Sequence, residues 1–74
     1  MQIEVRLFAT FRKSRWVSKK LSFDKAVDIR YILNGLQIKE EDLGIALING
    51  EYSKVDSMLK EGDVLALFPP IGGG

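Results

Sequence analysis

The sequence predicts an α+β domain in which a mixed β-sheet wraps one short helix. Residues 3–7 alternate between apolar and polar side chains, whereas residues 26–36 place apolar side chains at helical spacing. Two further apolar runs, at 45–48 and 64–68, indicate additional strands after the helix. With 74 residues the chain has room for one domain, which we expect over residues 1–70, followed by a flexible tail over 71–74.

The first predicted element is an antiparallel hairpin over roughly residues 2–22. The alternation over 3–7 is typical of a half-buried strand, and residues 8–11 continue it less regularly. The polar cluster at 12–15 predicts the turn, and the alternation over 17–23 predicts the return strand. We expect Phe8, Phe11 and Trp16 to pack in the core, whereas exposure of one of them on the sheet would indicate a partner interface.

The helix is predicted over residues 25–34, where the apolar spacing changes from two to between three and four. Asp24 or Ser22 is the expected N-cap, because a side-chain oxygen there can accept from the free N–H groups of the first turn. The Asn34-Gly35 pair is expected to end the helix in a left-handed residue.

The second half of the chain predicts three more strands. Residues 45–48 form a continuous apolar run, expected to be a central strand buried on both faces. Asn49-Gly50 predicts a tight hairpin into a short strand at 51–52. Residues 53–60 are expected to form a loop or one helical turn. A turn at 61–63 precedes the last strand, 64–68.

Three apolar side chains of segment 53–60 are expected to point into the interior of the protein, namely Val55, Met58 and Leu59. The whole order is two strands, a helix and three strands. If the last strand lies beside the first, the sheet wraps the helix in a β-grasp, or ubiquitin-like, arrangement.

The composition excludes several functions. The chain has no cysteine and no histidine, which excludes thiol nucleophiles, Ser-His-Asp triads, zinc fingers and iron–sulfur ligation. A carrier, a binding module or a small subunit is therefore favoured over an enzyme. No apolar run reaches the ~18–20 residues that cross a bilayer, and the first residues do not resemble a signal peptide. We expect a cytoplasmic protein without a membrane partner, since the lack of cysteine fits a reducing compartment.

Charge is distributed unevenly. Residues 1–20 hold six basic and one acidic residue, and residues 21–74 hold five basic and nine acidic ones. The basic segment 12–20 is interpreted as a solvated turn, with steering toward an acidic partner as the alternative. Nucleic-acid binding is disfavoured by a pI of about 8.0 and the lack of a nucleic-acid motif. The acidic pair Asp24 and Asp28 and the run 40–42 are interpreted as capping and surface charge, so no metal site is expected.

The C-terminal segment is the most informative part of the sequence. Pro69 and Pro70 lack backbone N–H donors and end the last strand, and the three glycines that follow have no side chains. Such a tail can enter a narrow channel and bring the carboxylate of Gly74 to a buried site. A disordered end or a cloning remnant is the alternative, but the Phe-Pro-Pro that precedes the glycines does not resemble a linker.

The ending LFPPIGGG resembles that of the small, sulfur-carrying subunit of molybdopterin synthase. That subunit belongs to a ubiquitin-like sulfur-carrier family that also includes the carrier of thiamine biosynthesis. The upstream order agrees with a first strand at 3–7, a hairpin at 45–50 and a turn at 62–63. Two departures are a shorter helix and connection up to residue 44, and Gly72 where a side chain is more usual.

The resemblance implies a carrier or co-substrate, a non-catalytic subunit with no bound cofactor. A ubiquitin-activating-like adenylyltransferase, using ATP and Mg²⁺, would adenylate the carboxylate of Gly74, and a persulfide donor would convert it to a thiocarboxylate. Gly72 and Gly73 would thread the tail into the large synthase subunit, where sulfur passes to a pterin precursor. The positions that would dock on the partner surface are Phe68, Pro69, Pro70 and Ile71. A carrier for thiamine or another pathway, and a ubiquitin-like protein modifier, are the alternatives.

Overall fold

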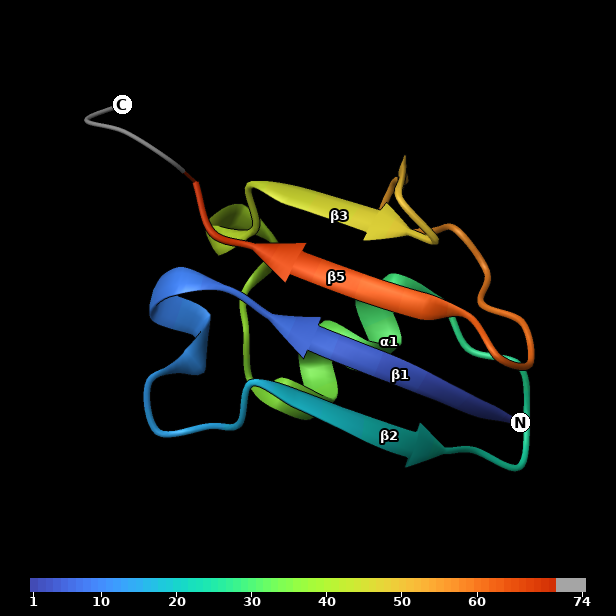
Figure 1. Cartoon of the computed structure of the whole chain (residues 1–74). Helices are drawn as coiled ribbons and strands as arrows, with labels where there is room; N and C mark the ends of the chain where they lie inside the picture. The colour runs from blue at the N-terminus through green and yellow to red at the C-terminus, as the bar shows by residue number, and fades with distance from the viewer. Residues whose placement is uncertain (71–74) are drawn as a thin grey trace.

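The computed structural model of the protein describes residues 1–70 and consists of one sheet, one α-helix and two short 3₁₀ helices (Figure 1). The elements in chain order are β1 (Gln2–Leu7), η1 (Ala9–Arg12), β2 (Ser18–Ser22), α1 (Ile29–Leu36), η2 (Glu40–Asp42), β3 (Ile45–Ile48), β4 (Glu51–Tyr52) and β5 (Val64–Phe68).

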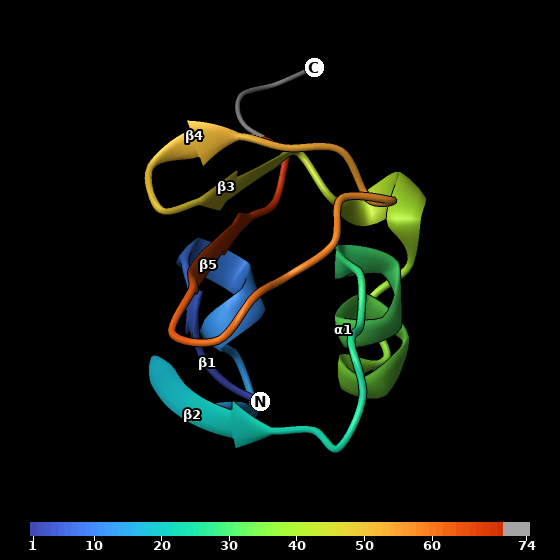
Figure 2. The same cartoon turned by 90° about the vertical axis from the view of Figure 1, so that its right-hand side faces the viewer.

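The sheet has the strand order β2-β1-β5-β3-β4, with β1 and β5 parallel and the other neighbours antiparallel. Helix α1 lies across one face of this sheet (Figure 2). The last strand therefore pairs beside the first, and the mixed sheet wraps one short helix. This is the β-grasp fold that the sequence predicts.

The core lies between α1 and the sheet, because alternate residues of each strand point toward the helix. Ile3, Val5 and Leu7 of β1 are buried, as are Leu65 and Leu67 of β5. The buried apolar residues from the rest of the chain are Phe11, Val27, Ile29, Ile32, Leu33, Ile38, Ala46 and Leu59. The alternation in the sequence is thus the alternation between the covered and the uncovered face of the sheet.

The helix begins later than the sequence predicts. Its N-cap is Asp28, whose Oδ1 accepts from the N–H of Tyr31 at 2.8 Å, so the predicted caps Asp24 and Ser22 are wrong. The N–H groups of Ile29 and Arg30 donate to carbonyls of the 55–57 segment. Residue 28 forms a β-bridge with residue 58, which keeps the chain before the helix extended. Tertiary contacts therefore set this boundary.

The helix also ends later than predicted, since Asn34 and Gly35 lie inside it. Gln37 takes the left-handed conformation at φ 60°, and its N–H donates to the carbonyl of Asn34. The N–H of Ile38 donates to the carbonyl of Leu33 at 2.9 Å, and both side chains are buried. These two hydrogen bonds form a Schellman cap, in which the apolar contact after the turn helps to stop the helix.

Three further expectations need correction. Residues 8–11 do not extend β1, because Ala9–Arg12 forms η1 and Ala9 has a φ of 52°. Strand β3 lies second from the sheet edge and buries Ala46 alone, so β5 is the central strand. Met58, which was expected to point into the interior, is 53% exposed, whereas Leu59 beside it is buried as expected. The turn at Asn49-Gly50 is confirmed, with positive φ at both residues and β4 as the return strand.

Candidate functional site

The candidate site is the carboxyl end of β5, where the chain leaves the sheet (Figure 1). Phe68 is the last residue of β5, and Pro69 and Pro70 follow it. Pro69 is half-buried and Pro70 is exposed. Because neither proline can donate a backbone hydrogen bond, the ladder of β5 ends here, as predicted. Residues 68–70 are called the exit segment below.

The exit segment begins on an aromatic stack. The rings of Phe8 and Phe68 lie parallel, with centroids 4.2 Å apart and 12° between their planes. The guanidinium of Arg12 lies over the Phe8 ring, 5.1 Å from its centroid, and its Nε donates to the carbonyl of Leu7 at 2.7 Å. The 3₁₀ helix η1 thus places a cation on the outer side of the stack. These contacts fix the direction in which the chain leaves β5.

Gly44 supports the exit segment from the other side. Its N–H donates to the carbonyl of Phe68 at 2.8 Å. A Cβ built at Gly44 would lie 2.6 Å from the carbonyl oxygen of Pro69 and 2.7 Å from the nitrogen of Pro70, which is closer than real Cβ contacts. Residue 44 must therefore be glycine for the two backbones to approach. One signal for this role is visible in the sequence, a lone glycine directly before a predicted strand.

An apolar patch extends from the exit segment across the face of the sheet opposite α1. The register pairs Phe68 with Ile45, and Leu47 with both Ala66 and Tyr52. The residues of β3 and β5 in these pairs alternate with buried ones, and Tyr52 is the register partner of Leu47, so their side chains share the uncovered face. Tyr52 is 82% exposed and the others are half-buried. We call the following set the outer patch: Phe8, Ile45, Leu47, Tyr52, Ala66 and Phe68.

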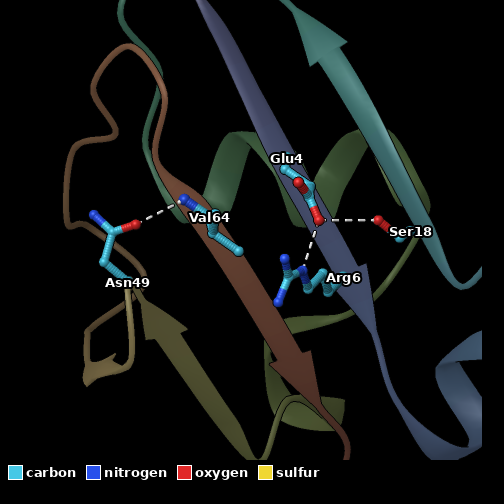
Figure 3. A network of polar contacts seen from close by, with 5 residues as sticks. All are labelled: Glu4, Arg6, Ser18, Asn49 and Val64. Carbon is cyan, nitrogen blue, oxygen red and sulfur yellow. Dashed lines mark hydrogen bonds and ion pairs between the residues drawn. The ribbon is translucent and has the colours of Figure 1, made fainter.

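The remainder of the same face, over β1 and β2, is polar. Glu4 Oε2 accepts from Arg6 Nε at 2.6 Å and from Ser18 Oγ at 3.2 Å (Figure 3). The hydrogen bond from Arg6 holds the pKa of the Glu4 carboxyl below its ordinary value of 4.5. This cluster pairs its own charges, so the outer patch is the part of the face suited to an apolar partner.

A second polar contact in Figure 3 fixes the start of β5. Asn49 Oδ1 accepts from the N–H of Val64 at 2.9 Å. In addition to the contact drawn there, Asn49 Nδ2 donates to Asp63 Oδ1 at 2.9 Å. The hairpin after β3 is therefore attached to the turn before β5. Strands β3 and β5, which carry four of the six outer-patch residues, are thus held in register at the end away from the exit segment.

The three aromatic residues that were expected in the core have different positions. Phe11 is buried and belongs to the core, and Trp16 is partly buried against it. Phe8 is half-buried in the stack on Phe68 and forms part of the outer patch. None of the three is exposed, so the criterion that the sequence set for a partner interface, exposure of one of them on the sheet, is not met.

The predicted docking residues Phe68, Pro69 and Pro70 all lie in the exit segment. Ile71 and the predicted tail residues Gly72, Gly73 and Gly74 lie outside the described residues.

Two of the acidic residues considered as metal ligands, Asp28 and Glu40, have structural partners. Asp28 caps α1, and Glu40 pairs with Arg30 through an Nε–Oε2 contact of 2.6 Å. Within residues 1–70, no group of three or more acidic side chains gathers where it could hold a metal ion. The helices of this part of the chain are also too short and polar to cross a membrane.

Comparison with known proteins identifies the family. The model of the ThiS family matches residues 5–74, which is nearly the whole chain. The chain belongs to the ThiS family. No curated protein sequence matches it. The ThiS-family match agrees with the sheet order and with the single helix, and it makes the fold that of a ubiquitin-like sulfur carrier.

Solved structures give the same result. A provisionally assigned molybdopterin converting factor subunit 1 from Pyrococcus furiosus is 25% identical, with a TM-score of 0.77 over 96% of this chain and 99% of that chain. SAMP1 from Haloferax volcanii is also 25% identical, with a TM-score of 0.76 over 100% of both chains. A chain in the complex of subunits 1 and 2 of the molybdopterin-converting factor from Helicobacter pylori is 26% identical, with a TM-score of 0.66 over 100% of both chains.

Proposed function

We propose that this ThiS-family protein carries sulfur on its C-terminal glycine for the synthesis of molybdopterin, as the small, non-catalytic subunit of the synthase in the cytoplasm. The family match through residue 74 is the observation that carries the proposal, because it extends over the whole Gly72–Gly74 tail. The converting-factor structures from Pyrococcus and Helicobacter support the choice of pathway.

The chemistry needs activation of the Gly74 carboxylate by a partner enzyme. The carboxylate oxygen attacks the α-phosphorus of Mg-ATP, and pyrophosphate leaves, which gives an acyl-adenylate. The terminal sulfur of a persulfide then attacks the carbonyl carbon, and AMP leaves. A thiol cleaves the remaining S–S bond and releases the thiocarboxylate together with a disulfide. ATP, Mg²⁺ and the persulfide belong to the partners.

Docking on the large subunit is proposed to use the exit segment and the outer patch together. The stack of Phe8 on Phe68 and the close approach of Gly44 to Pro69 fix where the tail begins. The outer patch offers half-buried apolar surface directly beside that point. The complex of subunits 1 and 2 in Helicobacter supports a partner of this kind, since a chain in that complex has the fold of this protein.

A second function, protein modification, is favoured by one observation. SAMP1 is also described as a small archaeal modifier protein, and it matches this chain over its full length. A modifier would use the same activation of Gly74, but a lysine amine would then attack the carbonyl carbon of the acyl-adenylate, AMP would leave, and an isopeptide bond would form. The two functions share the adenylation of Gly74 and differ in what then attacks the acyl-adenylate, a persulfide sulfur or a lysine amine.

The test is sulfur transfer with the cognate large subunit, using thiocarboxylated protein and the pterin precursor. We expect formation of the dithiolene product. Deletion of Gly73 and Gly74 should abolish it while leaving the thermal unfolding transition unchanged, because residues 1–70 hold the core. Substitution of Lys60, an exposed residue far from the exit segment, by alanine is the matched control.

Product formation by the truncated protein would overturn the proposal. Ladders of conjugates in a lysate from cells that express the full chain, together with no pterin product, would instead assign the modifier function.

A further inference from the structure

Strand β2 forms one open edge of the sheet. In the described part of the chain β1 is the single neighbour of β2 (Figure 1). The N–H of Leu7 donates to the carbonyl of Val17, and the N–H of Phe23 donates to that of Met1. In an antiparallel pair, residues whose backbone N–H and C=O groups bond to the neighbouring strand alternate with residues whose N–H and C=O groups point away from it. Ser18, Lys20 and Ser22 therefore direct their N–H and C=O groups away from the sheet.

An apolar groove lies next to this edge, between β2 and α1. Trp16, Leu21 and Phe23 line one side, and Tyr31 and Leu36 line the other. Its volume is about 220 Å³, below the roughly 300–1,000 Å³ of typical small-molecule sites. A groove of this size suits a few aliphatic side chains better than a cofactor. We call it the edge groove.

The charges around the edge groove are almost all positive. Residues 13–25 contain five basic residues and one acidic residue, Asp24. Lys19 lines the groove, and Lys25 Nζ lies 4.8 Å from the centroid of the Tyr31 ring. Arg15 lies between β2 and the end of α1, where its Nη2 donates to the carbonyl of Leu36 at 3.0 Å. The surface around the groove is therefore complementary to a negatively charged partner.

We propose that the edge of β2 binds an extended, acidic peptide segment of another protein by β-augmentation. The segment would pair with the outward backbone groups of Ser18, Lys20 and Ser22. Alternate aliphatic side chains would enter the edge groove, and flanking carboxylates would meet the lysines. The site is separate from the exit segment and the outer patch, which lie over the carboxyl end of β5 and the opposite face of the sheet.

Two other arrangements fit the edge less well. A second copy of this chain, paired strand to strand, would bring Lys19 and Lys20 against the same lysines of its partner, and lysines on an edge strand oppose such pairing. The edge at β4 has two strand residues, Glu51 and Tyr52, and offers too few backbone groups for stable augmentation.

The binding test uses a synthetic peptide of four alternating valines and isoleucines followed by three glutamates, titrated into isotopically labelled full-length protein. We expect saturable shifts of the amide signals of Ser18, Lys20 and Ser22, and of the indole N–H of Trp16. A peptide with lysines in place of the glutamates should bind at least about threefold more weakly, the size of one or two exposed ion pairs.

A proline substitution tests the backbone pairing itself. The N–H of Lys20 points outward, so Lys20→Pro removes one augmentation donor and keeps every hydrogen bond to β1. We expect Lys20→Pro to weaken peptide binding about tenfold, the effect of losing one hydrogen bond. Lys20→Ala keeps the N–H and is the matched control, with a loss below about threefold.

Two substitutions of opposite charge at one position in the groove test whether the bound segment is acidic. Gly35 lines the groove on α1, and a Cβ there meets nothing within 4 Å, so Gly35→Glu and Gly35→Lys both fit the fold. The glutamate variant should bind the acidic peptide more weakly than the lysine variant. Equal binding by the two variants would contradict the charge argument.

Deletion of Gly73 and Gly74 should leave peptide binding unchanged, which separates this proposal from the carrier function. The proposal is overturned if the peptide shifts no β2 amide at millimolar concentration, if the shifts map to the outer patch, or if Lys20→Pro binds as well as Lys20→Ala. Concentration-dependent shifts at β2 without peptide would show self-pairing of the chain instead.

Discussion

The two faces of the sheet are built from the same strands but differ in what covers them. On the inner face, Val5, Leu65 and Leu67 are completely buried under α1. On the outer face, Leu47, Ala66 and Phe68 are of similar apolar character and yet stay half-exposed. The inner face accounts for the fold, whereas the outer face keeps apolar surface next to the exit segment. Apolar character alone does not separate the two roles, and the position of the helix does.

Truncation of one leucine on each face should give the sharpest contrast. Leu65→Ala leaves a cavity in the fully buried core and should lower the free energy of unfolding by about 2–5 kcal/mol. Leu47→Ala on the outer face should cost less than about 1.5 kcal/mol, because its side chain is already half in solvent. Urea denaturation measures both, and equal losses would contradict the distinction between the faces.

The same two substitutions should have the opposite order of effect on association with the large subunit. Leu47→Ala should weaken association with the large subunit, whereas any Leu65→Ala protein that is folded should retain it. Titration calorimetry at a temperature where both variants are folded measures this. Unchanged affinity of Leu47→Ala would remove the outer patch from the proposed docking surface.

Substitution of Gly44 should disturb the exit segment. A methyl group at this position meets the backbone of Pro69 and Pro70, so Gly44→Ala should cost about 1–3 kcal/mol and shift the exit segment. Gly35→Ala is the control, since its Cβ meets nothing and alanine favours the helix by about 0.5–1 kcal/mol. Thermal unfolding should therefore move in opposite directions for the two variants. A neutral Gly44→Ala would show that the contact relaxes without cost.

The smallest effect concerns pH and the polar half of the outer face. Because Arg6 lowers the pKa of Glu4 below 4.5, the folded state favours the ionised carboxylate. This contribution to stability is present above the unfolded pKa and is lost as the pH falls through the lower, folded value. Glu4→Gln and Arg6→Gln should each reduce the acid sensitivity of the unfolding midpoint below pH 4.5. Identical acid limbs in the variants and the unsubstituted protein would contradict the ion pair.

The sequence predicted the parts of the fold that depend on local patterns. The alternation in 3–7, the Asn49-Gly50 turn and the apolar run at 64–68 are all found where expected. It misplaced the helix because Asp24 resembles an N-cap locally, whereas the 55–58 segment holds residue 28 in that role. The C-terminal stop depends on Ile38 reaching the core, which no local pattern shows.

The candidate site was likewise predicted only where it depends on local residue types. The prolines after Phe68 mark the end of the sheet in any context, so the exit segment could be placed from residue types alone. The stack of Phe8 on Phe68 and the approach of Gly44 to Pro69 join residues far apart in the sequence. Such contacts follow from the sheet order, and a single sequence does not specify them.

The central claim, that Gly74 carries sulfur, is tested most directly by the intact mass of the protein. The chain is incubated with a cognate activating enzyme, ATP, Mg²⁺ and a sulfide source, and its mass is measured before and after. We predict an increase that corresponds to the exchange of one oxygen for one sulfur, absent when Gly74 is deleted. An unchanged mass in the presence of an enzyme that activates another carrier would contradict the account.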